Sequence, residues 1–237
     1  MGQNQVLLSD SDDKFDRVCD IFTQAVLHSC QKVKTYLGFV DPEQKLYVRT
    51  RTLNEIFLMD FINYCKEKGA DDWISTCKMT KQQEMLMGVD WIWNLTGSGK
   101  NTNIQIAVQT VQLSECYRMT EMDEDPYEKI LEKSVADLDN RNKTKHDKLL
   151  EFCSSIGQNC MGLCIIYGVP GKPKEIRGIM MQHLKHLKGK TRCIREDTLL
   201  QYMKTVDYFI TTREMMEKYL FKKRSSQNDD RVYVNFL

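Results

Sequence analysis

Hydrophobic positions recur every three or four residues through most of the first hundred residues of the chain. This spacing predicts three helices, over residues 12–37, 52–68 and 80–96, because apolar side chains three or four apart share one face of a helix. Two of the predicted helices begin with a capping box, in which an N-cap hydroxyl and a side chain three residues later bind each other's backbone amides. The paired residues are Thr52 with Glu55 and Thr80 with Gln83.

Different patterns appear after residue 102. Residues 103–113 alternate apolar and polar side chains, which predicts a half-buried strand. Residues 161–167 are continuously apolar, which is typical of a central strand buried on both faces. Further strands are predicted over 206–210 and 232–237. Further helices are predicted over 147–156, 174–187 and 196–204, and one after a capping box of Thr211 with Glu214.

Taken together, these elements predict an α+β protein. A helix-rich N-terminal half would pack with a small sheet of about four strands and further helices in the C-terminal half. We expect residues 1–237 to form a single globular domain, because domains run to about 250 residues. Within it, the helical half covers about 11–96, a flexible, charged excursion covers about 115–146, and the α/β half covers about 147–237.

The composition says more about the cellular compartment of the chain than about its function. The net charge of +1 creates no overall field that favours nucleic acid. Nine cysteines without a secretory leader predict free thiols in the reducing cytoplasm. Gly2 raises the possibility of N-myristoylation, although that modification prefers Ser or Thr at the place that Val6 occupies.

No motif in the sequence indicates catalysis or a cofactor. The histidines have no nucleophile in a recognised frame, and His183, His186 and Cys193 do not have the spacing of a zinc site. We therefore predict no enzyme activity, no metal and no cofactor. The alternative is an enzyme or small-ligand-binding protein with a pocket between the sheet and the helices.

One stretch has a strong basic bias. Its residues fit either a solvated face or a weak contact with an acidic partner such as an anionic membrane. They include Lys172, Lys174, Arg177, Lys185 and Lys188.

Several long strings in the sequence resemble one known family. The strings include TLNEIFLMDFINYCKEKGADDW, GVDWIWNL and EFCSSIGQNCMGLCIIYGVPGKPKEIRG, and they resemble the Rab-fifteen effector proteins from about Val26 to Gly178. The resemblance implies a non-enzymatic partner of GTP-loaded Rab GTPases. It also implies a role in recycling transferrin-receptor-type cargo from the endocytic recycling compartment to the plasma membrane. The protein would then be peripheral on early and recycling endosome membranes.

A Rab-binding face needs apolar anchors with a polar rim, and such faces are enriched in Trp, Tyr, Met and Arg. The helical half offers candidates of these types, although each of them also fits a position in the core. The predicted contact residues are Trp73, Met79, Met85, Met87 and Trp91.

Overall fold

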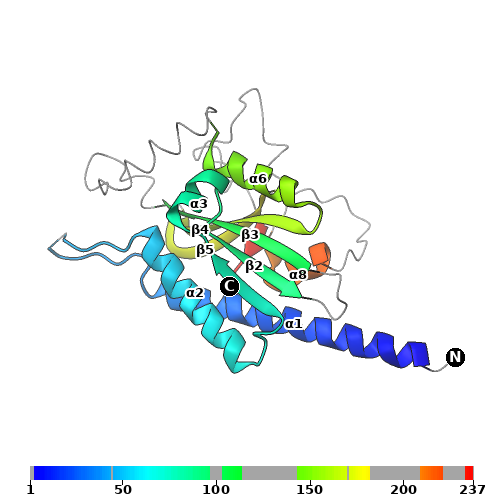
Figure 1. Ribbon diagram of the computed structural model, residues 1–237. Coiled ribbons are helices and arrows are strands. Elements are labelled where there is room, and N and C mark those ends of the chain that lie inside the picture. The colour runs from blue at the N-terminus through cyan, green and yellow to red at the C-terminus, as the bar shows by residue number, and fades with distance from the viewer. Residues whose placement is uncertain are drawn as a thin grey trace.

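The computed structural model describes residues 3–43, 45–96, 103–113, 143–169, 171–181, 209–220 and 233–236 (Figure 1). The helices in these residues are α1 (Gln3–Lys34), α2 (Thr50–Glu67), α3 (Lys81–Met87), α6 (Lys145–Ile156) and α8 (Thr212–Leu220). The strands are β1 (Ile74–Lys78), β2 (Trp91–Thr96), β3 (Asn103–Gln112), β4 (Cys160–Val169), β5 (Lys172–Met180), β6 (Ile210–Thr211) and β7 (Tyr233–Asn235).

A mixed sheet joins strands from both halves of the chain. Its order is β1-β2-β3-β4-β5-β7-β6. The pairs β3–β4 and β6–β7 are parallel, and the other neighbours are antiparallel. The predicted α+β class is confirmed, but the described residues form seven strands rather than about four. That the whole chain is one domain stays a prediction.

Helices cover both faces of the sheet. α1 and α2 lie across one face, and α6 with the short α3 lies across the other (Figure 1). α8 packs next to α1, where Arg213 binds Asp16 and Asp20. Apolar side chains can therefore be buried on both sides of the central strands.

The first core lies between the sheet and the pair α1 and α2. Trp93 of β2 is fully buried, and its ring centroid lies 5.1 Å from that of Phe22 on α1 and 5.0 Å from that of Phe61 on α2. Aromatic pairs of this kind contribute about 0.5–1.5 kcal/mol each beyond the area that they bury. These contacts hold both helices against β2.

The second core lies under α6. Because side chains alternate along a strand, Leu163 and Ile165 of β4 enter the first core while Cys164 and Ile166 enter the second. Every residue of β4 is buried. The prediction of a central strand from the continuous apolar run is therefore confirmed.

The helix predicted over residues 80–96 is wrong in its second half. Thr80 caps α3 in a capping box, but the helix ends before Gly88, whose φ of 67° is left-handed. The next apolar residues form β2, and both Trp91 and Trp93 point to the first core. A short apolar run fits both periods, and the pairing of β2 with β1 and β3 decides for the strand.

The helix predicted over residues 174–187 is also wrong in the part that the structure describes. Residues 172–180 form β5, which pairs with β4 along most of its length after a turn at Gly171. Pairing with a fully buried neighbour therefore decides the conformation of this stretch.

The predicted start of α2 is wrong by two residues. The helix begins at Thr50 with Arg49 as its N-cap, and no side chain caps it. Glu55 instead lies 2.7 Å from Lys78 Nζ on β1, so it ties the helix to the sheet rather than closing a box with Thr52.

Other predicted elements are confirmed. They are the first helix (α1, although it begins earlier), α6, β7 and the capping box of Thr211 with Glu214 at the start of α8. β3 is confirmed as a strand, but it is not half-buried. Of residues 104–112 only Gln105 is not buried, because α6 covers the second face of the strand. Most of the excursion at 115–146, the helix at 196–204 and most of the strand at 206–210 lie outside the described residues.

Candidate partner-binding surface

An extended arm joins α1 to α2 and projects away from the body of the protein (Figure 1). We call residues 38–43 and 45–49 the arm. Gly38 opens it with a φ of 78°, a left-handed conformation that glycine adopts without strain. The sequence pattern of this segment does not predict an arm, because Asp41 and Pro42 are typical of any loop.

The tip of the arm is held by one carboxylate. Asp41 accepts hydrogen bonds from the backbone N–H groups of Glu43 (3.1 Å), Lys45 (2.8 Å) and Leu46 (2.8 Å). These donors lower the pKa of Asp41 below its usual value of 3.8. The tip is thus closed by local hydrogen bonds rather than by contact with the rest of the protein.

The base of the arm is attached to the sheet. Gln112 of β3 donates a hydrogen bond from its side chain to the carbonyl of Val48 at 3.0 Å. Arg49 lies over the ring of Tyr47, with its guanidinium carbon 4.9 Å from the centroid, and donates to the Tyr47 hydroxyl. These bonds give the returning limb of the arm a defined position.

Exposed apolar side chains gather on this arm. Of the nine large apolar side chains that are exposed in the described residues, five lie between residues 36 and 47. The exposed fraction of the Val40 side chain is 77% and that of Leu46 is 69%. Single exposed apolar residues are common on protein surfaces, but a cluster of them indicates a binding surface. We call this set the arm surface, and it consists of Tyr36, Phe39, Val40, Leu46 and Tyr47.

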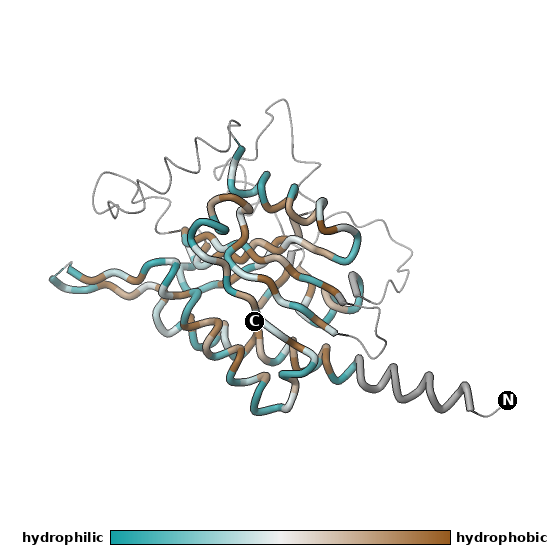
Figure 2. Tube along the Cα trace, in the orientation of Figure 1, coloured by the Kyte–Doolittle hydropathy of each residue, from teal (hydrophilic) through white to brown (hydrophobic). Residues whose placement is uncertain are grey.

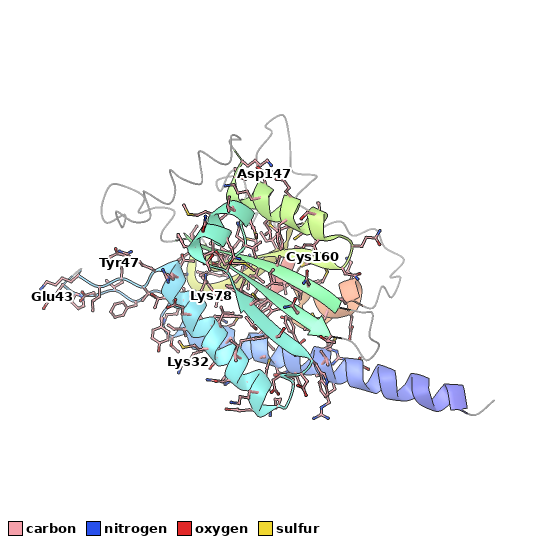
Figure 3. All side chains as sticks on the ribbon, in the orientation of Figure 1. Lys32, Glu43, Tyr47, Lys78, Asp147 and Cys160 are labelled. Carbon is pink, nitrogen blue, oxygen red and sulfur yellow. The ribbon has the colours of Figure 1, made fainter. Side chains whose placement is uncertain are left out.

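The tip beyond the arm surface is polar. Figure 2 shows hydrophobic stretches along the limbs of the arm and a hydrophilic end, and Figure 3 places Glu43 at that end with Tyr47 nearer the base. Glu43 binds Lys45 at 2.6 Å. The apolar side chains therefore lie along the arm rather than at its end.

Basic residues outnumber acidic ones in residues 31–51, which include the arm surface and which we call its rim. Residues 31–51 carry five basic and two acidic side chains, a net charge of +3. Lys174 of β5 adds to this rim, since a Cβ placed on Gly38 would lie 3.8 Å from its Cε. The basic residues of the segment are Lys32, Lys34, Lys45, Arg49 and Arg51.

Two of the contact residues predicted from the sequence lie in the core. The Trp91 side chain is fully buried, with its ring centroid 5.7 Å from that of Phe57 and 5.5 Å from that of Trp93. Met79 is 8% exposed and belongs to the second core. Neither side chain is available to a partner while the sheet is intact.

The other predicted contact residues are half-buried. Trp73 packs against the first core, with Arg17 over its ring, and Met87 packs against the second core. Met85 is half-buried on α3, where its carbonyl accepts a hydrogen bond from Lys148 of α6 at 2.8 Å. This α3 region therefore exposes less apolar surface than the arm, with Leu86 its most exposed apolar side chain.

The basic residues predicted to contact an anionic membrane also differ in exposure. Lys172 and Lys174 are exposed, whereas the Arg177 side chain is 13% exposed and lies 2.6 Å from Glu175. Lys185, Lys188 and Gly2 lie outside the described residues.

Ionisable side chains also gather in a network between β3 and α6, in which Asp90 and His146 are buried and the Lys145 side chain is 45% exposed. Asp90 accepts hydrogen bonds from the backbone N–H (2.5 Å) and the hydroxyl (2.7 Å) of Thr110, and Lys145 lies 2.9 Å from its other oxygen. His146 contacts Gln109, and burial lowers the pKa of His146 to about 4. The network ties α6 to the sheet and keeps His146 neutral at pH 7.

The described residues show neither a metal site nor a membrane-spanning helix. They contain no group of three or more side chains placed to hold a metal ion. None of their helices combines the length and apolar character needed to cross a membrane.

Comparison with known proteins gives a match over almost the whole chain. The sequence model of the Rab15 effector family matches residues 3–236. The mouse protein described as "Rab15 effector protein" is 35% identical over 240 residues, and the alignment covers all of both chains.

Proposed function

Because the chain belongs to the Rab15 effector family, we propose that it binds a Rab GTPase in the GTP-loaded form and catalyses no reaction of its own. The family match over residues 3–236 is the observation that carries this proposal. It supports an effector role and a Rab as the partner.

Preference for GTP follows from how small GTPases change shape. The γ-phosphate orders the switch segments, which are released after hydrolysis. A partner that contacts the ordered segments binds the GTP-loaded state more tightly and shifts the population toward it. An effector therefore needs a preformed surface, and the arm with its fixed tip and base offers one.

The test is binding of the purified chain to Rab15 and a panel of other Rabs. Each Rab is loaded with a non-hydrolysable GTP analogue or with GDP, and its retention on the immobilised chain is measured. We expect Rab15 with the GTP analogue to be retained and Rab15 with GDP to be lost. Equal retention of both states, or of neither by every Rab, would reject the proposal.

We also propose a setting for this binding, which is the recycling of transferrin-receptor-type cargo from the endocytic recycling compartment to the plasma membrane. The chain would be peripheral on early and recycling endosomes, brought there by a membrane-bound Rab. Its location in cells with and without that Rab tests this setting. A location that does not change when the Rab is depleted would contradict it.

A weak contact with anionic lipid is a separate part of the proposal. Lys172 and Lys174 are exposed and support it together with Lys185 and Lys188, although Lys172 also lies 3.3 Å from Glu175. Arg177 is 13% exposed and binds Glu175. Flotation with anionic vesicles should weaken as salt rises, because screening shortens the reach of surface charges. Flotation that is the same at low and high salt would count against the contact.

We do not propose the alternative of an enzyme or small-ligand-binding protein. Large apolar side chains from the sheet, α1, α2 and α6 occupy the two interfaces where its pocket was expected. Asp90 binds Lys145 and His146 contacts Gln109, so these groups serve the contact between α6 and the sheet, and no specific observation favours a substrate.

A further inference from the structure

We propose that the GTP-loaded Rab docks on the arm surface, with its ordered switch region against Phe39, Val40 and Leu46. This inference rests on the proposed function and names the surface that performs it. It replaces the placement expected from the sequence, which centred on α3 and β2.

The arm surface carries apolar side chains that a partner could still bury. Energetic hot spots of protein interfaces are large side chains that become fully desolvated on binding. Phe39 is 50% exposed and Leu46 is 69% exposed, so both have much surface left to bury. Trp91, by contrast, is already buried and has nothing to gain from a partner.

The arm has a fixed conformation before any partner binds. An interface loses affinity when its loops must be ordered during binding. Asp41 fixes the tip through three backbone donors, and Gln112 fixes the base through Val48. An arm held in this way fits one ordered surface and not a disordered one, which is the distinction between GTP-loaded and GDP-loaded switches.

The net positive charge of the rim argues against a second copy of this chain as the partner. In a two-fold dimer each arm surface would meet its own copy. Two rims that each carry a net +3 would then face each other, and like charges at an interface are repulsive. The basic rim instead fits a partner with acidic side chains around an apolar centre.

The polar tip of the arm argues against its insertion into a bilayer. Glu43 lies at the end of the arm, and Asp41 is hydrogen-bonded to its backbone N–H, whereas an inserting loop would need apolar side chains there. The apolar side chains behind the tip are placed instead to lie along the side of a protein.

The experiment compares arm variants with a control of the same chemistry elsewhere on the protein. Phe39→Ser with Leu46→Ser removes two anchors of the arm surface. Ile156→Ser is the matched control, because Ile156 is 51% exposed at the end of α6, on the other side of the sheet. Affinity for Rab15 loaded with a GTP analogue is measured by titration, after circular dichroism and thermal melting confirm folding.

We expect the arm variant to bind roughly 30-fold more weakly or worse, which is the effect of losing a single hot spot of about 2 kcal/mol. The Ile156→Ser control should bind like the parent. If the double variant does not fold, Val40→Ser alone tests the same surface, because Val40 is 77% exposed and supports no core.

The outcomes separate this inference from the proposed function. If the parent binds no GTP-loaded Rab, the proposed function fails and the docking site fails with it. If the parent binds and the folded arm variant binds equally well, only the docking site is wrong. Loss of vesicle flotation or of self-association in the arm variant, with Rab binding unchanged, would assign the arm surface to a bilayer or to a second copy.

Discussion

Asp41 shows how one side chain can fix a segment that has little contact with the core. Its carboxylate accepts three backbone hydrogen bonds at the tip of the arm, so the tip depends on a local acceptor. We expect Asp41→Ala to speed amide hydrogen exchange at Glu43, Lys45 and Leu46 several-fold, because their donors lose this partner. Glu43→Ala should leave these three rates nearly unchanged, and equal effects of the two substitutions would contradict the assignment.

The same hydrogen bonds predict how the arm responds to acid. Backbone donors lower the pKa of Asp41 below 3.8, so the folded arm binds a proton less tightly than the unfolded chain does. The stabilisation is complete above the unfolded pKa and is lost as pH falls through the lower, folded pKa. Exchange protection at Lys45 and Leu46, corrected for intrinsic rates, should therefore fall only below about pH 3.8. The Asp41→Ala protein should show no such step.

Single residues also mark the limit of prediction from the sequence. Trp91 and Met79 are residue types that are enriched at interfaces, but the same side chains also fill cores, and only the register of the sheet shows that these two are buried. Phe39 and Leu46 flank a loop in the sequence, where nothing indicates that the chain runs outward. The exposure of a side chain depends on the path of the backbone in three dimensions, and the local sequence pattern does not determine that path.

At the scale of elements, prediction from the sequence is correct where the hydrophobic pattern has one interpretation. β3 alternates apolar and polar residues along its length, and β4 contains the continuous apolar run of residues 161–167, so the sequence predicts both as strands. β2 has six residues and follows a real helix, so its apolar spacing could extend that helix as well as form a strand. Its pairing with β1 and β3 decided the outcome, and pairing is not visible in a single segment.

The junction between α3 and β2 yields a prediction about packing. Gly88 ends α3 with a φ of 67°, and a Cβ there would lie 2.2 Å from the Lys145 carbonyl oxygen at the start of α6. Gly69 has a φ of 64° but no atom within 4 Å of such a Cβ. Gly69→Ala should therefore cost only the left-handed strain, about 1–2 kcal/mol. Gly88→Ala should cost about 1–3 kcal/mol more, because α6 must move.

Urea denaturation of the two glycine variants measures this difference. The pair shares its backbone conformation and differs in the space around it, so the contrast isolates the contact between α3 and α6. Equal losses of unfolding free energy would show that α3 does not pack closely on α6.

At the scale of the whole molecule, the sheet depends on strands from distant parts of the chain. β3 and β4 are parallel neighbours, so the chain must cross over between them, and α6 lies in that crossover. β7, near the end of the sequence, lies between β5 and β6. The apolar alternation of the last residues predicted a docked strand, but the strand order could not be deduced from it.

Phe236 connects this last strand to the first core. Its side chain is 1% exposed and lies on Gly178 of β5, where a Cβ would come within 2.7 Å of the ring. Phe236→Ala removes a fully buried ring and leaves a cavity in the first core, so we expect it to lower the unfolding free energy by about 3–5 kcal/mol. Phe39→Ala removes the same ring from the exposed arm and should change stability by at most about 0.5 kcal/mol. Chemical denaturation of both full-length variants measures the contrast. A loss below about 1 kcal/mol at Phe236 would mean that β7 is not needed to complete the sheet.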